Sequence, residues 1–142
     1  MPPPSLPHPL PITDATVLEM YGHLFAPWVR DLGLREFEVG PGRACALLPQ
    51  SDALKLYAGA VCGQAIMAAV DTIVTLAMFT TDRIPKGTVY QHTHFLRPAV
   101  NDDFRIEAQV LRFGKASAFA EARLTLAAGG ELVAHASSEF AF

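Results

Sequence analysis

The chain has 142 residues, of which 51% are hydrophobic and 18% are charged. That length suits one domain with a sizeable core, and the low charge content indicates that another subunit covers part of the apolar surface. The net charge of −3 and the absence of lysine and arginine clusters disfavour a nucleic acid as the main partner. Two cysteines are too few for a disulfide framework, so we expect a cytoplasmic protein.

Residues 1–12 are rich in proline and lack the basic start and continuous apolar run of a signal peptide. We expect them to form a disordered leader before a single domain at residues 13–142. Thr13 or Asp14 is the predicted N-cap of the first helix. Pro27 is expected to kink or end this helix, whose apolar face is formed by Val17, Met20, Tyr21, Leu24, Phe25 and Trp28.

A β-hairpin is predicted next. Residues 34–39 alternate loosely, residues 43–48 form a second apolar run, and Gly40-Pro41-Gly42 between them is a strong turn signal. Polar residues 49–55 then connect the hairpin to the centre of the chain.

The central stretch, residues 57–81, is YAGAVCGQAIMAAVDTIVTLAMFTT. It is too long for one strand and rich in helix formers, so we predict a helix that begins near Cys62-Gly63-Gln64. Because apolar residues occur on nearly all sides, we expect this helix to be buried all round. Polar residues within it disfavour a membrane span. Asp71 is a lone acid in its middle, and since burying an ionised carboxylate is costly, it is either functional or a hydrogen-bonded structural acid.

Four more strands are predicted from β-branched residues or from clean alternation, at residues 88–96, 103–113, 118–126 and 132–142. Small alanines on their apolar faces would let a helix lie close to the sheet. The order of elements is typical of an α+β fold in which an antiparallel sheet wraps round a long central helix.

Several short motifs occur at fixed places along this pattern. Gly59 precedes the tripeptide Cys62-Gly63-Gln64, Asp71 follows Cys62 by nine residues, and Phe95-Leu96-Arg97-Pro98-Ala99 ends a predicted strand. In these motifs the chain, from about residue 13 to residue 142, resembles the hotdog-fold acyl-CoA thioesterases of the phenylacetate-degradation (PaaI-like) type. The resemblance implies the hotdog fold.

The motifs differ from the family pattern at three positions. Leu56 stands where the family has asparagine, Cys62 where it has histidine, and Gln64 where it has a second glycine. These differences favour the alternative of a non-catalytic acyl-CoA-binding hotdog protein. A hotdog dehydratase is disfavoured, because no histidine closely follows Asp71.

The resemblance implies an enzyme that hydrolyses an aromatic or medium- to long-chain acyl-CoA to the free acid and coenzyme A. Asp71 would act as general base or nucleophile, and the Gly63 amide would donate to the oxyanion with help from the helix dipole. Thr88 aligns with a hydroxyl residue that orients water, or is simply a β-branched residue that starts a strand. No cofactor is implied, because coenzyme A is part of the substrate.

Gly63 and Asp71 are eight residues apart, which is about 12 Å along a helix. One thioester carbon cannot easily touch both groups. An antiparallel homodimer that sets one Gly63 beside the other Asp71 removes the difficulty, and the resemblance also implies a dimer and a dimer of dimers.

Four further residues are candidate substrate contacts. Cys62 and Gln64 flank Gly63, and Cys62 is either a small buried thiol or a nucleophile activated at the helix start. Arg97 and Lys115 could meet the phosphates of coenzyme A. No metal is predicted, because the one histidine pair on a strand face, at residues 92 and 94, has no third ligand at useful spacing.

Overall fold

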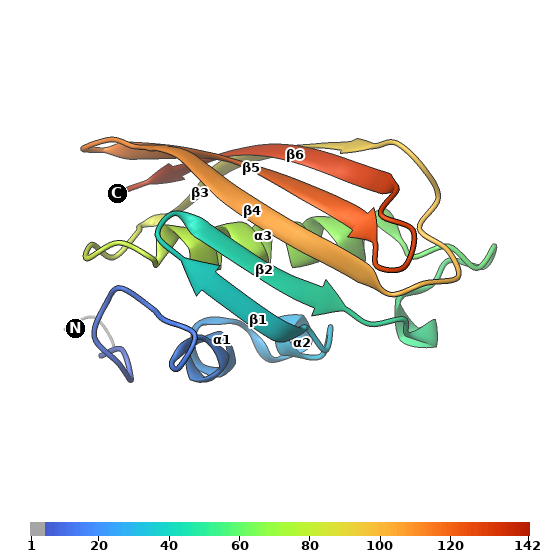
Figure 1. Cartoon of the computed structure of the whole chain (residues 1–142), viewed down its shortest axis with the longest axis horizontal. Helices are drawn as coiled ribbons and strands as arrows, with labels where there is room; N and C mark the ends of the chain where they lie inside the picture. The colour runs from blue at the N-terminus through green and yellow to red at the C-terminus, as the bar shows by residue number, and fades with distance from the viewer. Residues whose placement is uncertain (1–4) are drawn as a thin grey trace.

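The computed structural model describes residues 5–142 as one antiparallel sheet packed against a long helix (Figure 1). The six strands follow the order β1-β2-β4-β5-β6-β3 across the sheet. The predicted α+β architecture is confirmed. In chain order the elements are α1 (Val17–Leu24), α2 (Pro27–Arg30), β1 (Arg35–Gly40), β2 (Arg43–Leu48), the short 3-10 helix η1 (Asp52–Leu54), α3 (Gly63–Met78), β3 (Gly87–Phe95), β4 (Phe104–Phe113), β5 (Ser117–Leu126) and β6 (Leu132–Ala141).

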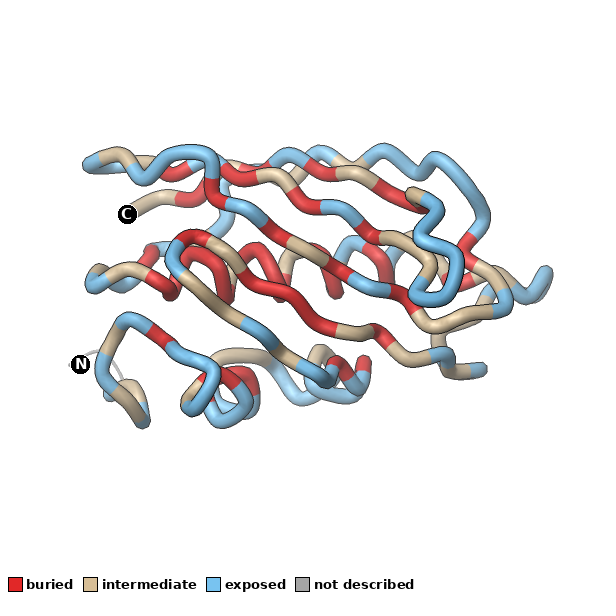
Figure 2. The backbone as a smooth tube through the Cα atoms, viewed as in Figure 1, coloured by how far each residue is buried: buried red, intermediate tan, exposed pale blue. Residues whose placement is uncertain are grey.

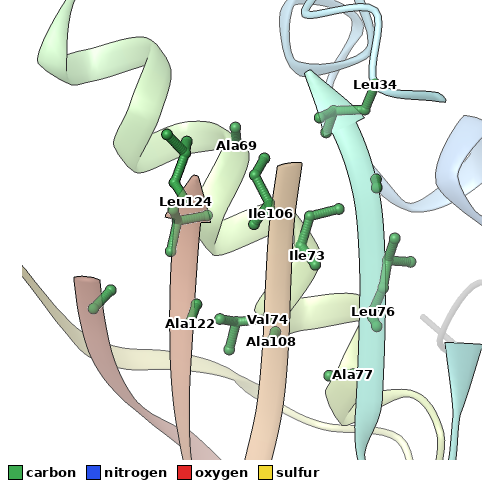
Figure 3. Close-up of a cluster of buried hydrophobic side chains, with 14 of the residues drawn as sticks. Leu34, Ala69, Ile73, Val74, Leu76, Ala77, Ile106, Ala108, Ala122 and Leu124 are labelled. Carbon is green, nitrogen blue, oxygen red and sulfur yellow. The ribbon is translucent and has the colours of Figure 1, made fainter. Parts of the chain in front are cut away.

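The core lies between α3 and the sheet. Every second residue of β4 from Phe104 to Val110 and of β5 from Ala118 to Leu124 is buried, and the small residues Ala108 and Ala122 let the helix come close. Figure 3 shows Ile73 and Val74 of α3 among side chains of these strands, and Figure 2 shows the buried residues along the same surfaces. Each fully buried leucine or isoleucine side chain contributes about 1.5–3 kcal/mol to folding, so this contact is the main stabilising element.

One side of α3 is not covered, so the prediction of a helix buried all round is wrong for the single chain. Gln64, Met67, Asp71 and Thr75 recur every three or four residues and therefore share one face of the helix. Met67 on that face is 41% exposed. The sheet packs against the opposite face, and no element of the described residues covers this one. Apolar composition alone could not distinguish burial within the chain from burial by a second chain.

The first helix begins later than predicted. The N-cap of α1 is Thr16 instead of Thr13 or Asp14, and no side chain caps its first turn. The Asp14 carboxylate accepts a hydrogen bond from the backbone N–H of Val39 at 2.8 Å. The acid therefore joins the N-terminal segment to β1.

Of the two outcomes expected at Pro27, a kink or an end of the helix, the structure has the end, and Trp28 lies on a separate helix. Helix α1 ends at Leu24, and the backbone at Ala26 is extended because a proline disfavours helical geometry in the residue before it. Pro27 is the first residue of α2. Proline is tolerated there because an N–H at the first position of a helix has no acceptor within the helix. The new helix direction leaves the Trp28 side chain 62% exposed.

The leader prediction needs correction for residues 5–12. Leu6 and Leu10 pack against the core, Ile12 is buried, and its backbone N–H donates to the Phe79 carbonyl at 3.0 Å. His8 also contacts Glu19 of α1. The apolar residues between the prolines explain this packing. Residues 1–4 of the predicted leader lie outside the described residues.

Candidate active site

Asp71 and Thr88 form the first half of the candidate site. Asp71 lies in the middle of α3, and Thr88 lies near the start of β3, which runs alongside. The Thr88 hydroxyl donates to the Asp71 carboxylate at 2.8 Å. Burial raises the pKa of Asp71 above its usual range, and the hydrogen bond from Thr88 offsets part of this rise. The two residues that the sequence singled out are therefore in direct contact, beside the open face of α3.

The Asp71 carboxylate faces a shallow pocket of about 330 Å³, which we call the Asp71 pocket. It is lined by Trp28, Gln64, Met67, Ala68, Asp71, Thr88 and Gln91. Gln64, expected on the same helix face as Asp71, lies there. The pocket is open to solvent along the uncovered side of α3, so a water molecule or a substrate can reach the carboxylate.

Gln91 is a pocket residue that the sequence analysis missed. Its amide donates to the backbone carbonyl of Met67 at 3.3 Å and to the Thr93 hydroxyl at 2.9 Å. Strict alternation from Thr88 would turn residue 90 towards the helix. A register irregularity between Thr88 and Tyr90 shifts the alternation by one, so Gln91 faces the helix instead. Nothing in the sequence signals this irregularity.

The start of α3 forms the second half of the site. Gly63 is the first helical residue, and Cys62 is the N-cap without a capping hydrogen bond from its side chain. The first N–H to bond back is that of Ile66, which donates to the Cys62 carbonyl at 3.2 Å. The N–H groups of residues 63–65 thus have no acceptor within the helix, nor elsewhere in the part of the chain described. They can stabilise a developing oxyanion, aided by the helix dipole.

A second pocket, of about 380 Å³, opens beside Gly63 and includes Leu56, Phe95 and Arg97 in its lining. A Cβ added at Gly63 would lie 3.4 Å from Cζ of Phe95. Glycine therefore keeps a narrow space between the helix start and this ring. Arg97 is exposed at the edge of this pocket.

The two halves belong to different parts of α3. Asp71 lies about 12 Å further along the helix axis than Gly63. Thr88 at one end of β3 contacts Asp71, whereas Phe95 at the other end lies against Gly63. A single chain therefore presents two half-sites, one with a carboxylate and the other with unpaired amides.

Of the other two predicted substrate contacts, Cys62 lies near the site and Lys115 does not. Cys62 is half-buried beside the Asp71 pocket, in an adjoining pocket that also includes Gln64. Lys115 lies in the connection between β4 and β5, where its backbone carbonyl accepts from the Arg83 guanidinium at 2.9 Å. That connection is at the opposite end of the sheet from the start of α3 (Figure 1). The structure does not bring Lys115 to either half-site of its own chain.

His92 and His94 stack on each other with ring centroids 4.7 Å apart. They pair with Ser137 and His135 of β6, on the sheet face that points away from α3. Neither histidine therefore lines the Asp71 pocket. Within residues 5–142 there is no group of three or more histidine, cysteine, aspartate or glutamate residues able to hold a metal ion.

None of the helices described combines the length and the hydropathy needed to cross a membrane. The longest, α3, has 16 residues and carries the open polar face.

The profile of the thioesterase superfamily matches residues 58–133, a range that includes both half-sites. The chain belongs to this superfamily. A comparison with curated proteins found no match.

Solved structures share the fold over most of the chain. Thioesterase superfamily member 2 from zebra fish is 25% identical, with a TM-score of 0.83 over 92% of this chain and 98% of its own. The PaaI protein of the E. coli phenylacetic acid degradation operon is 17% identical, with a TM-score of 0.79 over 89% and 90%. A hypothetical thioesterase from Streptococcus pneumoniae, solved with coenzyme A, is 17% identical, with a TM-score of 0.69 over 75% and 83%. The expected hotdog fold and likeness to PaaI are confirmed.

Proposed function

We propose that this protein is an acyl-CoA thioesterase that hydrolyses an aromatic or medium- to long-chain acyl-CoA to the free acid and coenzyme A. The observation that carries the proposal is the Asp71 carboxylate, buried enough to raise its pKa, held by Thr88 and facing an open pocket. Membership of the thioesterase superfamily supports the reaction class. The Streptococcus pneumoniae structure, solved with coenzyme A, supports coenzyme A as the leaving group.

In the proposed reaction the ionised Asp71 removes a proton from water as that water attacks the thioester carbonyl. Thr88 fixes the carboxylate by its hydrogen bond. The Gly63 amide and the helix dipole stabilise the oxyanion, and its collapse expels coenzyme A as thiolate, which takes up the proton held by Asp71. Asp71 could instead attack the carbonyl and form an anhydride. Label found in the Asp71 carboxyl group after one turnover in ¹⁸O-labelled water would require this anhydride, because general-base attack places the label only in the acid product.

A homodimer is part of the proposal, and strand β3 supports it. Strand β3 lies at one edge of the sheet, and β6 is its only partner among the described strands. Its sequence, GTVYQHTHF, has no aspartate, glutamate, lysine or arginine. The opposite edge, β1, carries Arg35, Glu36 and Glu38. Because charged side chains protect sheet edges from pairing, β3 is the edge suited to a second copy.

Pairing of two β3 strands would complete both half-sites. A two-fold axis near the middle of β3, at Gln91 and His92, lays the two strands antiparallel. The partner's Phe95 end then lies beside the Thr88 end of the first chain. Because Phe95 contacts Gly63 and Thr88 contacts Asp71, this arrangement carries the partner's Gly63 towards Asp71.

Such a dimer would also cover apolar side chains that one chain leaves in water. Met67 on α3, Val89 and Phe95 on β3, and Leu96 after it are exposed. A dimer of dimers needs another contact, for which Tyr90, Leu111 and Phe119 on the outer face of the sheet are available. Lys115, which lies away from both half-sites of its own chain, would meet coenzyme A across a contact between chains. Arg97 lines the pocket beside Gly63, and we propose that it contacts a phosphate of the coenzyme A bound at the Gly63 of its own chain.

Replacing Thr88 with valine is expected to move the acidic limb of the activity profile to higher pH. The hydroxyl lowers the pKa of Asp71, so its loss raises that pKa further and leaves less ionised base at a given acidic pH. Measuring kcat against pH for the wild type and Thr88→Val checks this. An unshifted acidic limb with a uniformly lower kcat would show that Thr88 acts only by position.

Thiol release across a panel of acyl-CoA substrates tests the function, with straight chains from acetyl to palmitoyl and with phenylacetyl. Hydrolysis that depends on Asp71 supports the thioesterase. Tight binding of acyl-CoA without turnover would instead support the non-catalytic alternative, which the residues at Leu56 and Cys62 favour.

The expected cytoplasmic location, to which the unpaired Cys45 and Cys62 are suited, stays a prediction.

A further inference from the structure

A third pocket adjoins the Asp71 pocket and is the most apolar of those near the site. It has a volume of about 250 Å³ and shares Trp28 and Gln64 with the Asp71 pocket. Its remaining walls include the buried Leu32 and Ala65 and the half-buried Leu54. We call it the Trp28 pocket, because Trp28 lines both spaces.

Resting on the proposed function, we propose that the Trp28 pocket binds the distal end of an uncharged acyl group, and that Trp28 determines which acyl groups reach it. The two pockets adjoin at Trp28 and Gln64, so an acyl chain bound with its carbonyl at Asp71 would pass Gln64 to meet the apolar walls. Asp31 lines the pocket and is exposed, so its carboxylate would repel a negatively charged acyl end.

Helix geometry gives the length at which an acyl chain held at Asp71 should begin to reach the Trp28 pocket. Gln64 lies seven residues before Asp71, which is about 10 Å along the helix. An extended chain advances roughly 3.5 Å for every three bonds, so about nine bonds span this distance. Acetyl and butyryl groups would therefore stay in the Asp71 pocket. Decanoyl and longer groups would reach the Trp28 pocket.

The exposure of Trp28 fits this role. A large aromatic side chain left 62% exposed on a four-residue helix contributes little to the core. An acyl chain laid against the indole would remove apolar surface of both from water. Ligand binding at this residue can be observed directly, because Trp28 is the only tryptophan of the chain.

The first test uses the tryptophan fluorescence of the full-length protein and three ligands: coenzyme A, butyl-CoA thioether and decyl-CoA thioether, which cannot be hydrolysed. We expect decyl-CoA to shift the emission of Trp28 to shorter wavelength, because the acyl mimic displaces water from the indole. Coenzyme A should leave the emission unchanged, and butyl-CoA, which meets Trp28 only from the Asp71 pocket, should give a clearly smaller shift than decyl-CoA. An equal response to all three, or no response to decyl-CoA at concentrations that saturate binding, would overturn the proposal.

The second test compares kcat/KM for butyryl-CoA and decanoyl-CoA. Trp28→Ala and Ala53→Phe, which fills the pocket from its exposed rim, should each change the ratio of the two values by about tenfold or more, a size typical of pocket changes of one or two methylenes. Leu18→Ala removes an equally exposed side chain from neighbouring α1 and should leave the ratio unchanged. Unchanged ratios in both pocket variants would contradict the assignment.

The two proposals can fail separately. Hydrolysis of acyl-CoA without a response of Trp28 to decyl-CoA would leave the thioesterase standing and remove the Trp28 pocket. A decyl-specific response in a protein that hydrolyses none of the panel would keep the pocket and remove the catalytic function.

Discussion

Replacing Asp71 with asparagine is expected to reduce thioester hydrolysis by about 10²–10⁴-fold, the usual contribution of a general base. Asparagine keeps the shape of the side chain, and its amide oxygen can still accept from Thr88, so the pocket should remain intact. The loss should therefore appear in kcat, with little change in KM. Thiol release from the best acyl-CoA of the panel measures it.

Asp82→Asn is the matched control for charge, because Asp82 is an exposed acid in the loop after α3. It should retain wild-type activity. Wild-type turnover in Asp71→Asn would remove Asp71 from the chemistry, and equal losses in both variants would mean that net charge accounts for the effect.

The same substitution should stabilise the fold at neutral pH. Burial raises the pKa of Asp71 in the folded state, so the folded protein holds that proton more tightly than the unfolded chain. The group therefore destabilises the fold as pH rises from the unfolded pKa through the raised folded pKa, and the penalty is complete above both. Asp71→Asn removes this penalty. Its melting temperature should exceed that of the wild type at pH 7, and the difference should shrink towards pH 4.

Replacing Gly63 with proline should lower kcat by about 10²–10³-fold, the usual loss when one oxyanion donor is removed. Proline lacks the backbone N–H and is tolerated in the first turn of a helix. Gly63 is the first residue of α3, and Cys62 before it has the extended backbone (φ −68°, ψ 150°) that proline requires of its neighbour. The substitution thus deletes the proposed donor and keeps the helix.

Gly63→Ala is the control for the added side chain. Its Cβ lies in the same place, 3.4 Å from Cζ of Phe95, but its N–H remains. We expect alanine to retain most of the activity that proline loses, and circular dichroism should show equal helix content in both. Equal kcat in the two variants would mean that crowding against Phe95, and not the lost amide, sets the rate.

Much of the fold could be predicted from local patterns. The alternation along β4 and β5 places Ile106, Ala108 and Leu124 on the buried face, where the structure has them. The helix start at Cys62-Gly63 was predicted within a residue, because glycine and the apolar run that follows mark it. Thr88 was singled out through the family resemblance, but its hydrogen bond to Asp71 was not predicted, since no spacing rule relates a helix residue to a strand seventeen positions later.

What the sequence could not reveal depends on tertiary geometry. The strand irregularity after Thr88 turns Gln91 into the pocket, and no residue type marks it. The spacing of Trp28 fits the face of α1, but the restriction that Pro27 places on Ala26 breaks the helix and exposes the indole. The apolar character of α3 reflects both the core and the open face of Met67 and Asp71, and composition cannot separate them.

Mixing the two inactive variants, Asp71→Asn and Gly63→Pro, tests most directly whether the site is shared between two chains. In a mixed dimer one site combines both substitutions, and the other has the intact Asp71 of one chain and the intact Gly63 of the other. Random exchange of equal amounts should therefore restore about one quarter of wild-type activity, since half the dimers are mixed and each has one working site. Activity that stays at the level of the separate variants, while mixed dimers are shown to form, would contradict a site built from two chains.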